Sequence, residues 1–483
     1  MAVFLCFFAL YAVTSQRGVS WQDSGEFQYR ILSGDYQWHS GIARAHPLYI
    51  VMAQGFAALF PKSACFYAAN LFSGLGLALA LALLAYNVMR LTRSVRSAVL
   101  AVSVLGFAHM AWWMGTIAEV YTWSLVFLMA EVLCLIRYSE RRDGRWLIAL
   151  FGANGAHWGI HDVALLGLPV YTVLLVSEVV RHKWRGAGTV CGCALLWVMG
   201  GGMVIWQAAC LVRETGNLVL VMKSVLFGDG YERQVLGVGG FELKMWLANM
   251  ALAGISFATP CWVFAGRGFF LREESGPSGV LNQLRALTVL HGVFWVRYFV
   301  PDQATFVLPT LGLLAVWVGL GCSAVCKDKR IYAILLTAGL VCAVAGPGLL
   351  CDAMGRGGLT VHRSRTLPFR DEMRYWMIPW KQDETSAVRF VEEAGKQLGA
   401  GDVLLADATA AGPLLAARAA NILPKKWRLV TPWSGETDAD VLALVRKRTL
   451  KVYAVSRAAG YAPKSLLEAG CAFEPEGILF CVK

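Results

Sequence analysis

The segment Trp21-Gln22-Asp23-Ser24-Gly25-Glu26-Phe27 carries two carboxylates three residues apart and lies shortly after the first apolar run of the chain. Acidic side chains at the mouth of a membrane bundle cost free energy, so they usually have a functional role. If the segment is helical, Asp23 and Glu26 share one face of the helix. The rest of the sequence indicates on which side of a membrane this face lies and which polar residues meet it there.

The composition is typical of a polytopic membrane protein. Of the 483 residues, 57% are hydrophobic and only 16% are charged, whereas a soluble domain has about 25% charged residues. The 18 tryptophans and 24 phenylalanines fit the enrichment of aromatic residues at membrane interfaces. A net charge of +12 is best explained by loop Lys and Arg that orient the spans, so nucleic-acid binding is not expected.

Eleven apolar runs are candidate membrane spans, and they fall at about 1–14, 64–89, 97–115, 121–137, 146–159, 163–180, 188–211, 246–265, 284–300, 305–326 and 331–351. The run 46–60 is short and is bracketed by Pro47 and Pro61, so we expect an interfacial or re-entrant helix there. With a cytoplasmic N-terminus, every inside loop is then basic, as the positive-inside rule demands. Counting 46–60 as a span would reverse all later loops and break this rule.

The chain is expected to divide into three parts. Residues 1–351 form a transmembrane domain whose first outer loop is 15–63, and residues 352–385 form a charged juxtamembrane segment. Residues 386–483 alternate short apolar strands with helical patterns, which is typical of a small parallel α/β sheet. With eleven spans, this soluble α/β domain is extracytoplasmic. Its expected elements are strands at 403–406, 427–430 and 450–455, helices at 409–420, 437–448 and 464–469, and a final hairpin at 471–482.

The thirteen cysteines do not form a metal-binding pattern. Several stand in apolar runs, where Cys acts as a small hydrophobic residue. The segment Cys191-Gly192-Cys193 lacks the paired spacing and the His partners of a zinc site. In the α/β domain, Cys471 and Cys481 could form a disulfide bridge.

The predicted topology places acids and imidazoles from five distant turns at one membrane surface. These residues are Asp23, Glu26, His39, His46, Glu119, His157, His161, Asp162 and Asp302. His157 and His161 are four residues apart, so they could bind a metal or simply cap the turn. A divalent ion could also be held by the outer acids, although the spacing alone leaves this open. Three further polar residues, His109, Glu131 and His291, fall inside spans and indicate a polar interior.

Four motifs follow one another in the order of a known family. They are the segment 21–27, His46-Pro47-Leu48-Tyr49, Ala118-Glu119-Val120-Tyr121, and Tyr298 followed by Pro301-Asp302-Gln303 and Leu308-Pro309. Over roughly residues 15–385 the chain resembles the multi-spanning membrane proteins related to the animal plexin O-mannosyltransferase, within the GT-C glycosyltransferases. The expected fold is therefore an α-helical polytopic membrane protein, GT-C-like with about 11 spans, that carries a small C-terminal α/β extracytoplasmic domain.

The resemblance implies an inverting glycosyltransferase of the plasma (inner) membrane. It would move a sugar, with mannose as the implied sugar, from a polyprenyl-phosphate-linked donor to an acceptor hydroxyl of a protein or glycan on the extracytoplasmic face. GT-C enzymes place an acid of the first outer loop at the sugar, and Asp23 occupies that position. A carboxylate there can take the proton of the attacking hydroxyl, with Glu26 supporting its geometry or acceptor binding.

The leaving polyprenyl phosphate needs a cation or hydrogen-bond donors. Arg44, Arg297 or a later arginine such as Arg363 could supply them. The remaining candidates for substrate binding are His46, Glu119, His157, His161 and Asp302.

Two other classes of function stay open at this point. A transporter or flippase of lipid-linked sugars would place its site near the bilayer midplane, often within repeated halves. The sequence has no evident internal repeat, and most candidate acids lie at one face. Coordination of substrate by Glu131 and His109 would favour transport. A sensor or scaffold would instead bind through its outer domain and would not need Asp23.

Overall fold

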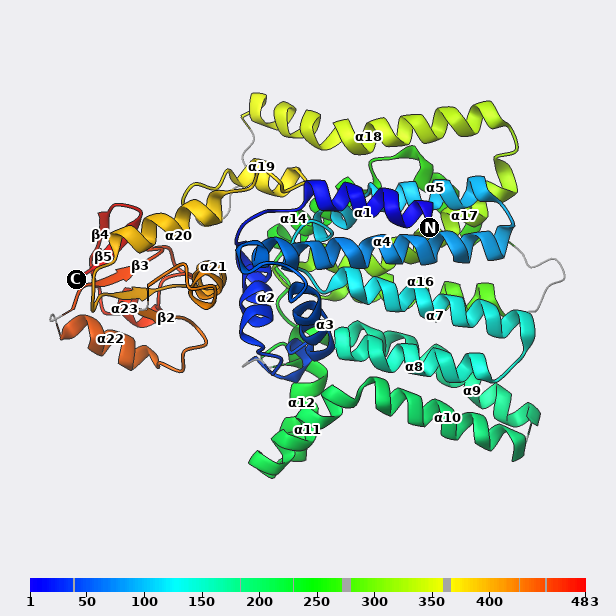
Figure 1. The fold of residues 1–483 in the computed structure, drawn as a ribbon, viewed down its shortest axis with the longest axis horizontal. Helices are drawn as coiled ribbons and strands as arrows, with labels where there is room; N and C mark the ends of the chain where they lie inside the picture. Colours follow the sequence, from blue (N-terminus) through cyan, green and yellow to red (C-terminus); the bar gives the residue numbers. More distant parts are fainter. Residues whose placement is uncertain are drawn as a thin grey trace.

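The computed structural model describes residues 1–37, 40–182, 184–228, 230–271, 279–358, 366–424, 426–447 and 450–483. The apolar runs expected from the sequence are helical, and their helices run alongside one another in a bundle with a small α/β domain at one end (Figure 1). The bundle helices are α1 (Ala2–Thr14), α4 (Cys65–Thr92), α5 (Val95–Gly106), α7 (Tyr121–Arg141), α8 (Arg145–Ile160), α9 (Leu168–His182), α10 (Trp184–Gly200), α11 (Gly202–Thr215), α14 (Leu243–Gly254), α15 (Val263–Phe269), α16 (Val280–Arg297), α17 (Val307–Val325) and α18 (Lys329–Arg356).

Short elements connect the bundle helices and build the face toward the α/β domain. They are α2 (Gln22–Ser33), η1 (Ile42–Arg44), α3 (Pro47–Ala57), η2 (Lys62–Ala64), α6 (His109–Met114), η3 (Asp162–Gly167), α12 (Leu218–Phe227), α13 (Glu232–Val235), η4 (Ile255–Phe257), η5 (Pro260–Trp262), η6 (Gln303–Phe306) and α19 (Glu372–Met377). Helix α3 has only 11 residues, so the run that was expected not to cross a membrane is indeed a short helix.

The expected number of eleven spans is not confirmed. Five helical stretches in the described residues are long and apolar enough to cross a membrane, and seven if each bent pair counts as one span. The bends are 71° between Ala187–Gly200 and Gly202–Thr215, and 91° between Leu243–Phe257 and Pro260–Phe269. Glycine at one break and proline at the other explain both bends. The 12 residues of α5 rise only about 18 Å, short of the roughly 30 Å of a bilayer core.

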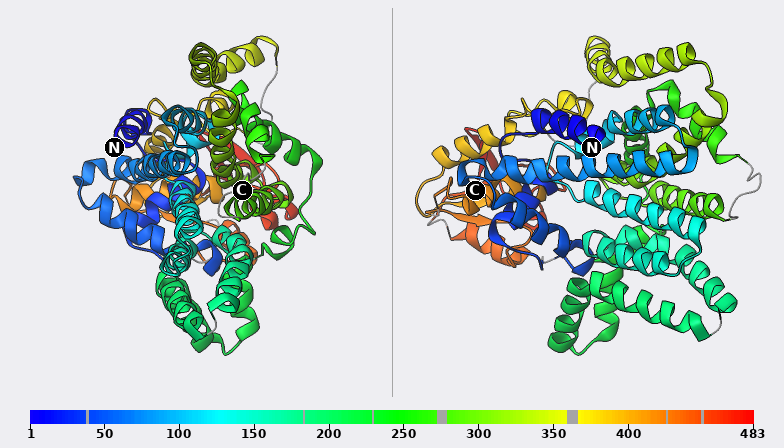
Figure 2. Two further views of the ribbon diagram at one scale, coloured as in Figure 1. Left: turned by 90° about the vertical axis from the view of Figure 1, so that its right-hand side faces the viewer. Right: turned by 45° about the vertical axis from the view of Figure 1, so that its right-hand side comes forward.

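The centre of the bundle is formed by α4, α7 and α17, which are the best buried of the candidate spans. Small residues let these helices approach closely, as is usual in membranes. A Cβ on Gly76 of α4 would lie 2.9 Å from the Trp123 ring of α7, and one on Gly321 of α17 would lie 2.0 Å from a carbonyl oxygen of α15. Helix α18 lies at the margin of the bundle, and only 11% of its apolar window is buried (Figure 2).

The C-terminal part folds as the sequence predicts. Its elements are α20 (Ser386–Gln397), β1 (Val403–Leu405), α21 (Ala408–Ala419), β2 (Arg428–Val430), α22 (Asp438–Arg446), β3 (Val452–Ala454), α23 (Lys464–Glu468), β4 (Phe473–Glu476) and β5 (Leu479–Val482). The sheet has the order β2-β1-β3-β5-β4, with β1 parallel to both β2 and β3. The antiparallel β4–β5 hairpin completes it beside β3.

The bridge suggested between Cys471 and Cys481 is wrong, because both are free thiols. The hairpin register explains this result. Cys481 pairs with Glu474, and Ala472 pairs with Lys483, so Cys471 does not lie opposite Cys481.

The α/β domain packs on the first outer loop through α2 and α21. Gly25 of α2 meets the backbone of Gly412 and Pro413, and a Cβ on Gly25 would lie 2.9 Å from the Gly412 carbonyl carbon. The indole of Trp21 donates a hydrogen bond to Ser386 (2.8 Å). These contacts tie both the start of α2 and its first turns to the C-terminal part of the chain.

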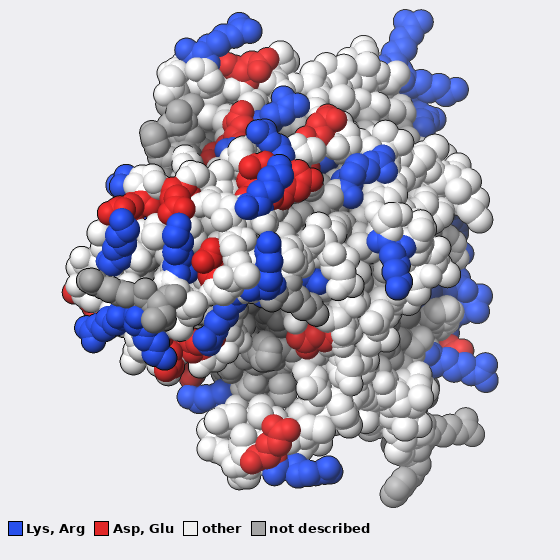
Figure 3. Space-filling model, turned by 60° about the vertical axis from the view of Figure 1, so that its left-hand side comes forward, with Lys and Arg blue, Asp and Glu red and all other residues white. Residues whose placement is uncertain are grey.

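The turns α4–α5, α7–α8, α9–α10 and α17–α18 lie at the end of the bundle away from the sheet (Figure 1). These are the loops whose Lys and Arg led to the cytoplasmic assignment. Figure 3 shows a similar division on one face of the molecule: charged side chains gather on the α/β side and at the opposite margin, and fewer lie between them. The long apolar helices and this charge pattern are those of an integral membrane protein.

Candidate active site

A cleft of about 940 Å³ opens between the bundle and the α/β domain. Five of the sequence-distant turns that carry predicted site residues contribute to its wall. Eight of the predicted residues line it, namely Asp23, Glu26, Arg44, His46, Glu119, His161, Asp162 and Asp302. Two others, His157 and Arg297, lie elsewhere, and His39 and Arg363 fall outside the described residues.

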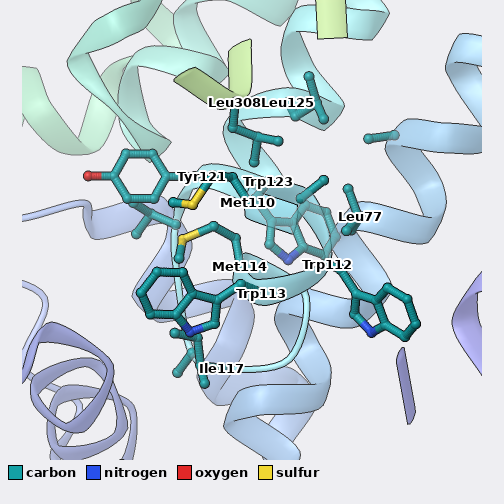
Figure 4. Close-up of a cluster of buried hydrophobic side chains, with 14 of the residues drawn as sticks. Leu77, Met110, Trp112, Trp113, Met114, Ile117, Tyr121, Trp123, Leu125 and Leu308 are labelled. Carbon is teal, nitrogen blue, oxygen red and sulfur yellow. The ribbon is translucent and has the colours of Figure 1, made fainter. Parts of the chain in front are cut away.

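The apolar floor of the cleft comes from α6 and the turn that follows it. Figure 4 shows Met110, Trp113 and Met114 of α6 close to Ile117 and Tyr121, all of which line the cleft. These side chains are buried, so they present a largely dry surface beneath the polar residues. A cleft with an apolar lining and few convergent polar groups is the usual form of a small-molecule site.

Helix α2 presents Asp23 to the cleft. The Asp23 side chain is exposed, whereas the residues that follow it in the motif are buried. The Ser24 hydroxyl donates a hydrogen bond to the Glu119 carboxylate (2.9 Å), which joins α2 to the turn before α7. Asp23 also lies in the first turn of its helix, where the helix dipole favours a negative charge.

Glu26, the second acid of the motif, points into the protein. Its side chain is 4% exposed, and its Oε1 lies 3.6 Å from Nη1 of Arg30, one turn further along α2. Burial, and then the charge of Asp23, raises the pKa of Glu26 from 4.5 to about 8. Glu26 therefore keeps its proton at neutral pH, and Asp23 is the acid of the pair that is placed to accept one.

Arg30 was not singled out from the sequence, yet it organises this loop. Its guanidinium is fully buried and donates hydrogen bonds to the carbonyl oxygens of Asp35 (3.1 Å), Arg44 (3.3 Å) and Ala45. These contacts fix the segment that carries Arg44 and His46 against α2. The signal in the sequence was the spacing of Glu26 and Arg30, four residues apart on one helix face.

Two hydrogen bonds with Ser73 fix the backbone of Glu119. Its N–H donates to the Ser73 hydroxyl (2.8 Å), and that hydroxyl donates to the Glu119 carbonyl oxygen (3.0 Å). Burial, together with the nearby charge of Asp23, raises the pKa of the Glu119 carboxyl well above its usual range. Glu119 is thus a rigidly placed carboxyl that favours the protonated form beside the exposed Asp23.

The imidazole rings of His46 and His161 are neighbours in the lining of the cleft, with centroids 5.1 Å apart. Nδ1 of His46 lies 2.8 Å from the Ile160 carbonyl and must donate to it. Nδ1 of His161 accepts from the Val163 N–H (3.1 Å). Burial lowers the pKa of both rings, so each is neutral. Nε2 of His46 is then an acceptor and Nε2 of His161 a donor.

Arg44 is the one cation among the described residues that line the cleft. Its guanidinium lies 5.4 Å from the centre of the Tyr231 ring. Although burial opposes its charge, the charges of Asp23 and Glu26 raise the pKa of Arg44. Arg297 instead donates to the Gly237 carbonyl oxygen (3.2 Å) outside the cleft. Of the two described arginine candidates, Arg44 is therefore the one placed to meet a ligand anion.

The structure places His157 in the bundle interior and not at the outer surface. Its Nδ1 lies 2.9 Å from Glu131, and its Nε2 lies 2.7 Å from the Ser124 hydroxyl. Glu131 also accepts from Asn154 (3.1 Å) and Tyr171 (2.7 Å). A buried carboxylate needs hydrogen-bond partners. Glu131 finds two of them, Asn154 and His157, on the face of α8 that points into the bundle. His157 thus belongs to a packing network.

The divalent ion suggested for the outer acids stays a prediction. Within the parts of the chain that the structure describes, no group of three or more His, Cys, Asp or Glu side chains is arranged to hold an ion. His157 and His161, spaced four residues apart, use ring nitrogens for Glu131 and Val163.

Solved structures share this architecture. ArnT from Cupriavidus metallidurans bound to undecaprenyl phosphate matches with a TM-score of 0.57 and 12% identity, over 100% of this chain and 97% of that one. Arabinofuranosyltransferase AftD from Mycobacteria matches with a TM-score of 0.53 and 10% identity, over 96% of this chain and 36% of that one. The chain has the fold of the GT-C membrane glycosyltransferases, as its motifs implied.

The sequence itself is related to a protein O-mannosyl-transferase. It is 30% identical over 155 residues to the mouse protein O-mannosyl-transferase TMEM260. This match covers 32% of the chain and about a fifth (22%) of the curated relative. No family model matches the chain.

Proposed function

We propose that the protein is a glycosyltransferase that moves a sugar from a polyprenyl-phosphate-linked donor to an acceptor hydroxyl. The observation that carries the proposal is the placement of Asp23, exposed in a deep cleft whose described lining holds one cation, Arg44. Two similarities add support. ArnT has this fold in complex with undecaprenyl phosphate, and TMEM260 is an O-mannosyl-transferase.

In this proposal, Asp23 accepts the proton of the acceptor hydroxyl as its oxygen attacks the anomeric carbon of the sugar. A positioned carboxylate of this kind typically contributes about 10²–10⁴-fold to a rate. The bond between the anomeric carbon and the phosphate oxygen breaks on the opposite face, so the configuration inverts. The electron pair stays on the polyprenyl phosphate, whose added charge is stabilised by Arg44.

The other lining residues have binding roles in the proposal. Glu119 and the two imidazoles supply fixed donors and acceptors for sugar hydroxyls, and Asp302 adds a second carboxylate to the lining. Glu26 and Arg30 are positioning residues, because they hold α2 and the Arg44 segment together. Mannose is the first sugar to test, since TMEM260 is named for its transfer.

We place the cleft on the extracytoplasmic face of the membrane, with the α/β domain. The basic turns at the opposite end of the bundle support this orientation. A lipid-linked donor would enter sideways from the bilayer, which suits a cleft that lies at the end of the helices.

The midplane polar residues do not favour a flippase. The carboxylate of Glu131 already accepts hydrogen bonds from Asn154 and Tyr171 and contacts His157, so both of its oxygens are engaged within the protein. A transport substrate would have to displace this network.

The proposal is tested with the full chain in lipid nanodiscs and polyprenyl-phosphate mannose labelled in the sugar. Peptide and oligosaccharide acceptors are offered separately, and labelled products are separated by chromatography. Transfer to either acceptor, with release of polyprenyl phosphate, is the expected result. No transfer from mannose-, glucose- or arabinose-linked polyprenyl phosphates to any acceptor would contradict the proposal.

A further inference from the structure

The α/β domain contributes its own wall to the cleft, and the residues involved share one place in the sheet. They are Ala408, Thr409, Trp433, Ala459, Gly460 and Tyr461. The first pair follows β1, Trp433 follows β2, and the last three follow β3. All therefore lie beyond the carboxyl ends of the three strands that run parallel to one another.

The topology at this edge forms a crevice. Strand β1 lies between β2 and β3, so the connection after β1 leads to one side of it and the next connection crosses to the other side. In open α/β sheets, ligands bind outside the carboxyl ends of the strands at such a switch point. Thr409, Trp433 and Tyr461 lie at this edge of the sheet and line the cleft.

The chemistry of this wall differs from that of the bundle wall. Of the described residues, those that the α/β domain contributes to the cleft are uncharged, whereas the bundle contributes Asp23, Arg44 and Asp302. Trp433 and Tyr461 are partly exposed and offer aromatic surface to the cleft. The Thr409 side chain adds a hydroxyl group, which can donate and accept hydrogen bonds. Aromatic faces combined with a few neutral polar groups suit a sugar, which has apolar C–H faces and many hydroxyls.

Helix packing also fixes this wall of the α/β domain relative to Asp23. Helix α21 begins at Ala408 and packs on α2 at Gly412 and Gly25, two residues after Asp23. A ligand held against Thr409 therefore lies against an element whose position is fixed relative to Asp23.

We infer that the carboxyl edge of β1, β2 and β3 is a binding site for a neutral, hydroxyl-rich carbohydrate, with Trp433 and Tyr461 as its aromatic contacts. The identification of this carbohydrate as the acceptor, presented to Asp23, rests on the proposed function. The inference that this edge binds a carbohydrate is independent of the proposed function.

The test measures binding to the full chain in nanodiscs, with neutral oligosaccharides of mannose, glucose and N-acetylglucosamine as probes. Saturation-transfer NMR gives the affinity of each probe for the unaltered chain and for the Trp433→Ala variant. The matched control is Phe480→Ala, because Phe480 is a partly exposed aromatic residue of the same domain that does not line the cleft.

We expect at least one oligosaccharide to bind, Trp433→Ala to weaken its binding roughly ten-fold or more, and Phe480→Ala to leave it within two-fold or so. Thermal unfolding of each variant checks that the domain stays folded. Equal binding in Trp433→Ala, or the absence of any oligosaccharide binding, would overturn the inference. Binding of a Ser/Thr peptide in place of sugar, lost in Trp433→Ala, would overturn it as well. Intact sugar binding without any transfer would count against the proposed function alone.

Discussion

Gly25 in the Asp-Ser-Gly-Glu motif and Gly412 in the α/β domain pack backbone against backbone. A Cβ on Gly412 would lie 2.6 Å from the Gln22 carbonyl oxygen and 2.9 Å from the Glu26 nitrogen. The glycine of the motif is therefore explained by a contact with a helix almost at the other end of the chain. The same contact sets the orientation of α2 and hence the direction in which Asp23 points.

Adding a methyl group at this contact should separate the two helices. Gly412→Ala must move backbone atoms, and overpacking of this kind costs about 1–3 kcal/mol. We expect a lower thermal unfolding temperature and faster hydrogen exchange in α21. The control is Gly55→Ala in α3, where a Cβ meets no atom within 4 Å. An unchanged unfolding temperature in Gly412→Ala would show that the two helices are not in contact.

Arg44 should determine the affinity for the lipid donor. Arg44→Gln removes the single cation among the described lining residues, and loss of a charged hydrogen bond raises a dissociation constant by roughly ten- to a hundred-fold. We expect a corresponding rise in the KM for the donor and little change in the KM for the acceptor. Arg297→Gln is the control, since Arg297 lies outside the cleft. An Arg297→Gln variant with the larger defect would reverse the assignment.

Arg30 should act through the loop that it holds. Arg30→Gln leaves carbonyl oxygens of Asp35, Arg44 and Ala45 without their buried donor, and each unpaired group costs about 1–3 kcal/mol. We expect reduced stability together with a higher KM for the donor. Arg17→Gln serves for comparison, because Arg17 is exposed. Equal behaviour of the two variants would mean that the carbonyl contacts of Arg30 are unimportant.

The buried Glu26 should make stability depend on pH in a defined direction. Its pKa is raised to about 8 in the folded protein, from 4.5, so the folded state binds this proton more tightly than the unfolded state does. The stabilisation is complete below about pH 4.5 and is lost as the pH rises toward about 8. Glu26→Gln, which keeps the shape without titrating, should shrink the difference in unfolding temperature between about pH 5 and pH 8. A pH profile identical to that of the unaltered chain would contradict this.

Local patterns in the sequence predicted much of the architecture. Hydrophobic runs and alternating strands depend on neighbouring residues, so the bundle helices and the α/β elements fall close to where they were expected. The grouping of Asp23, Glu119 and Asp302 in one cleft could also be anticipated, because loop charge places whole turns on one side of a membrane.

What the sequence could not supply depends on tertiary contacts. The inward direction of His157 is set by Glu131, a partner on a different helix. The amphipathic pattern of α2 does not predict that Arg30 donates hydrogen bonds to carbonyl oxygens of the following loop. The span count is not confirmed because α1 and α5 have only 13 and 12 residues and two other apolar runs are bent at glycine or proline, and periodicity alone reveals neither feature.

The most direct test of the central claim is sugar transfer by the Asp23→Asn variant, measured with saturating polyprenyl-phosphate sugar and acceptor. Asp352→Asn, an exposed aspartate on α18, controls for the change in charge. We predict that Asp23→Asn lowers kcat by roughly 10²–10⁴-fold while donor binding is retained, and that Asp352→Asn transfers sugar normally. Normal transfer by Asp23→Asn would contradict the account.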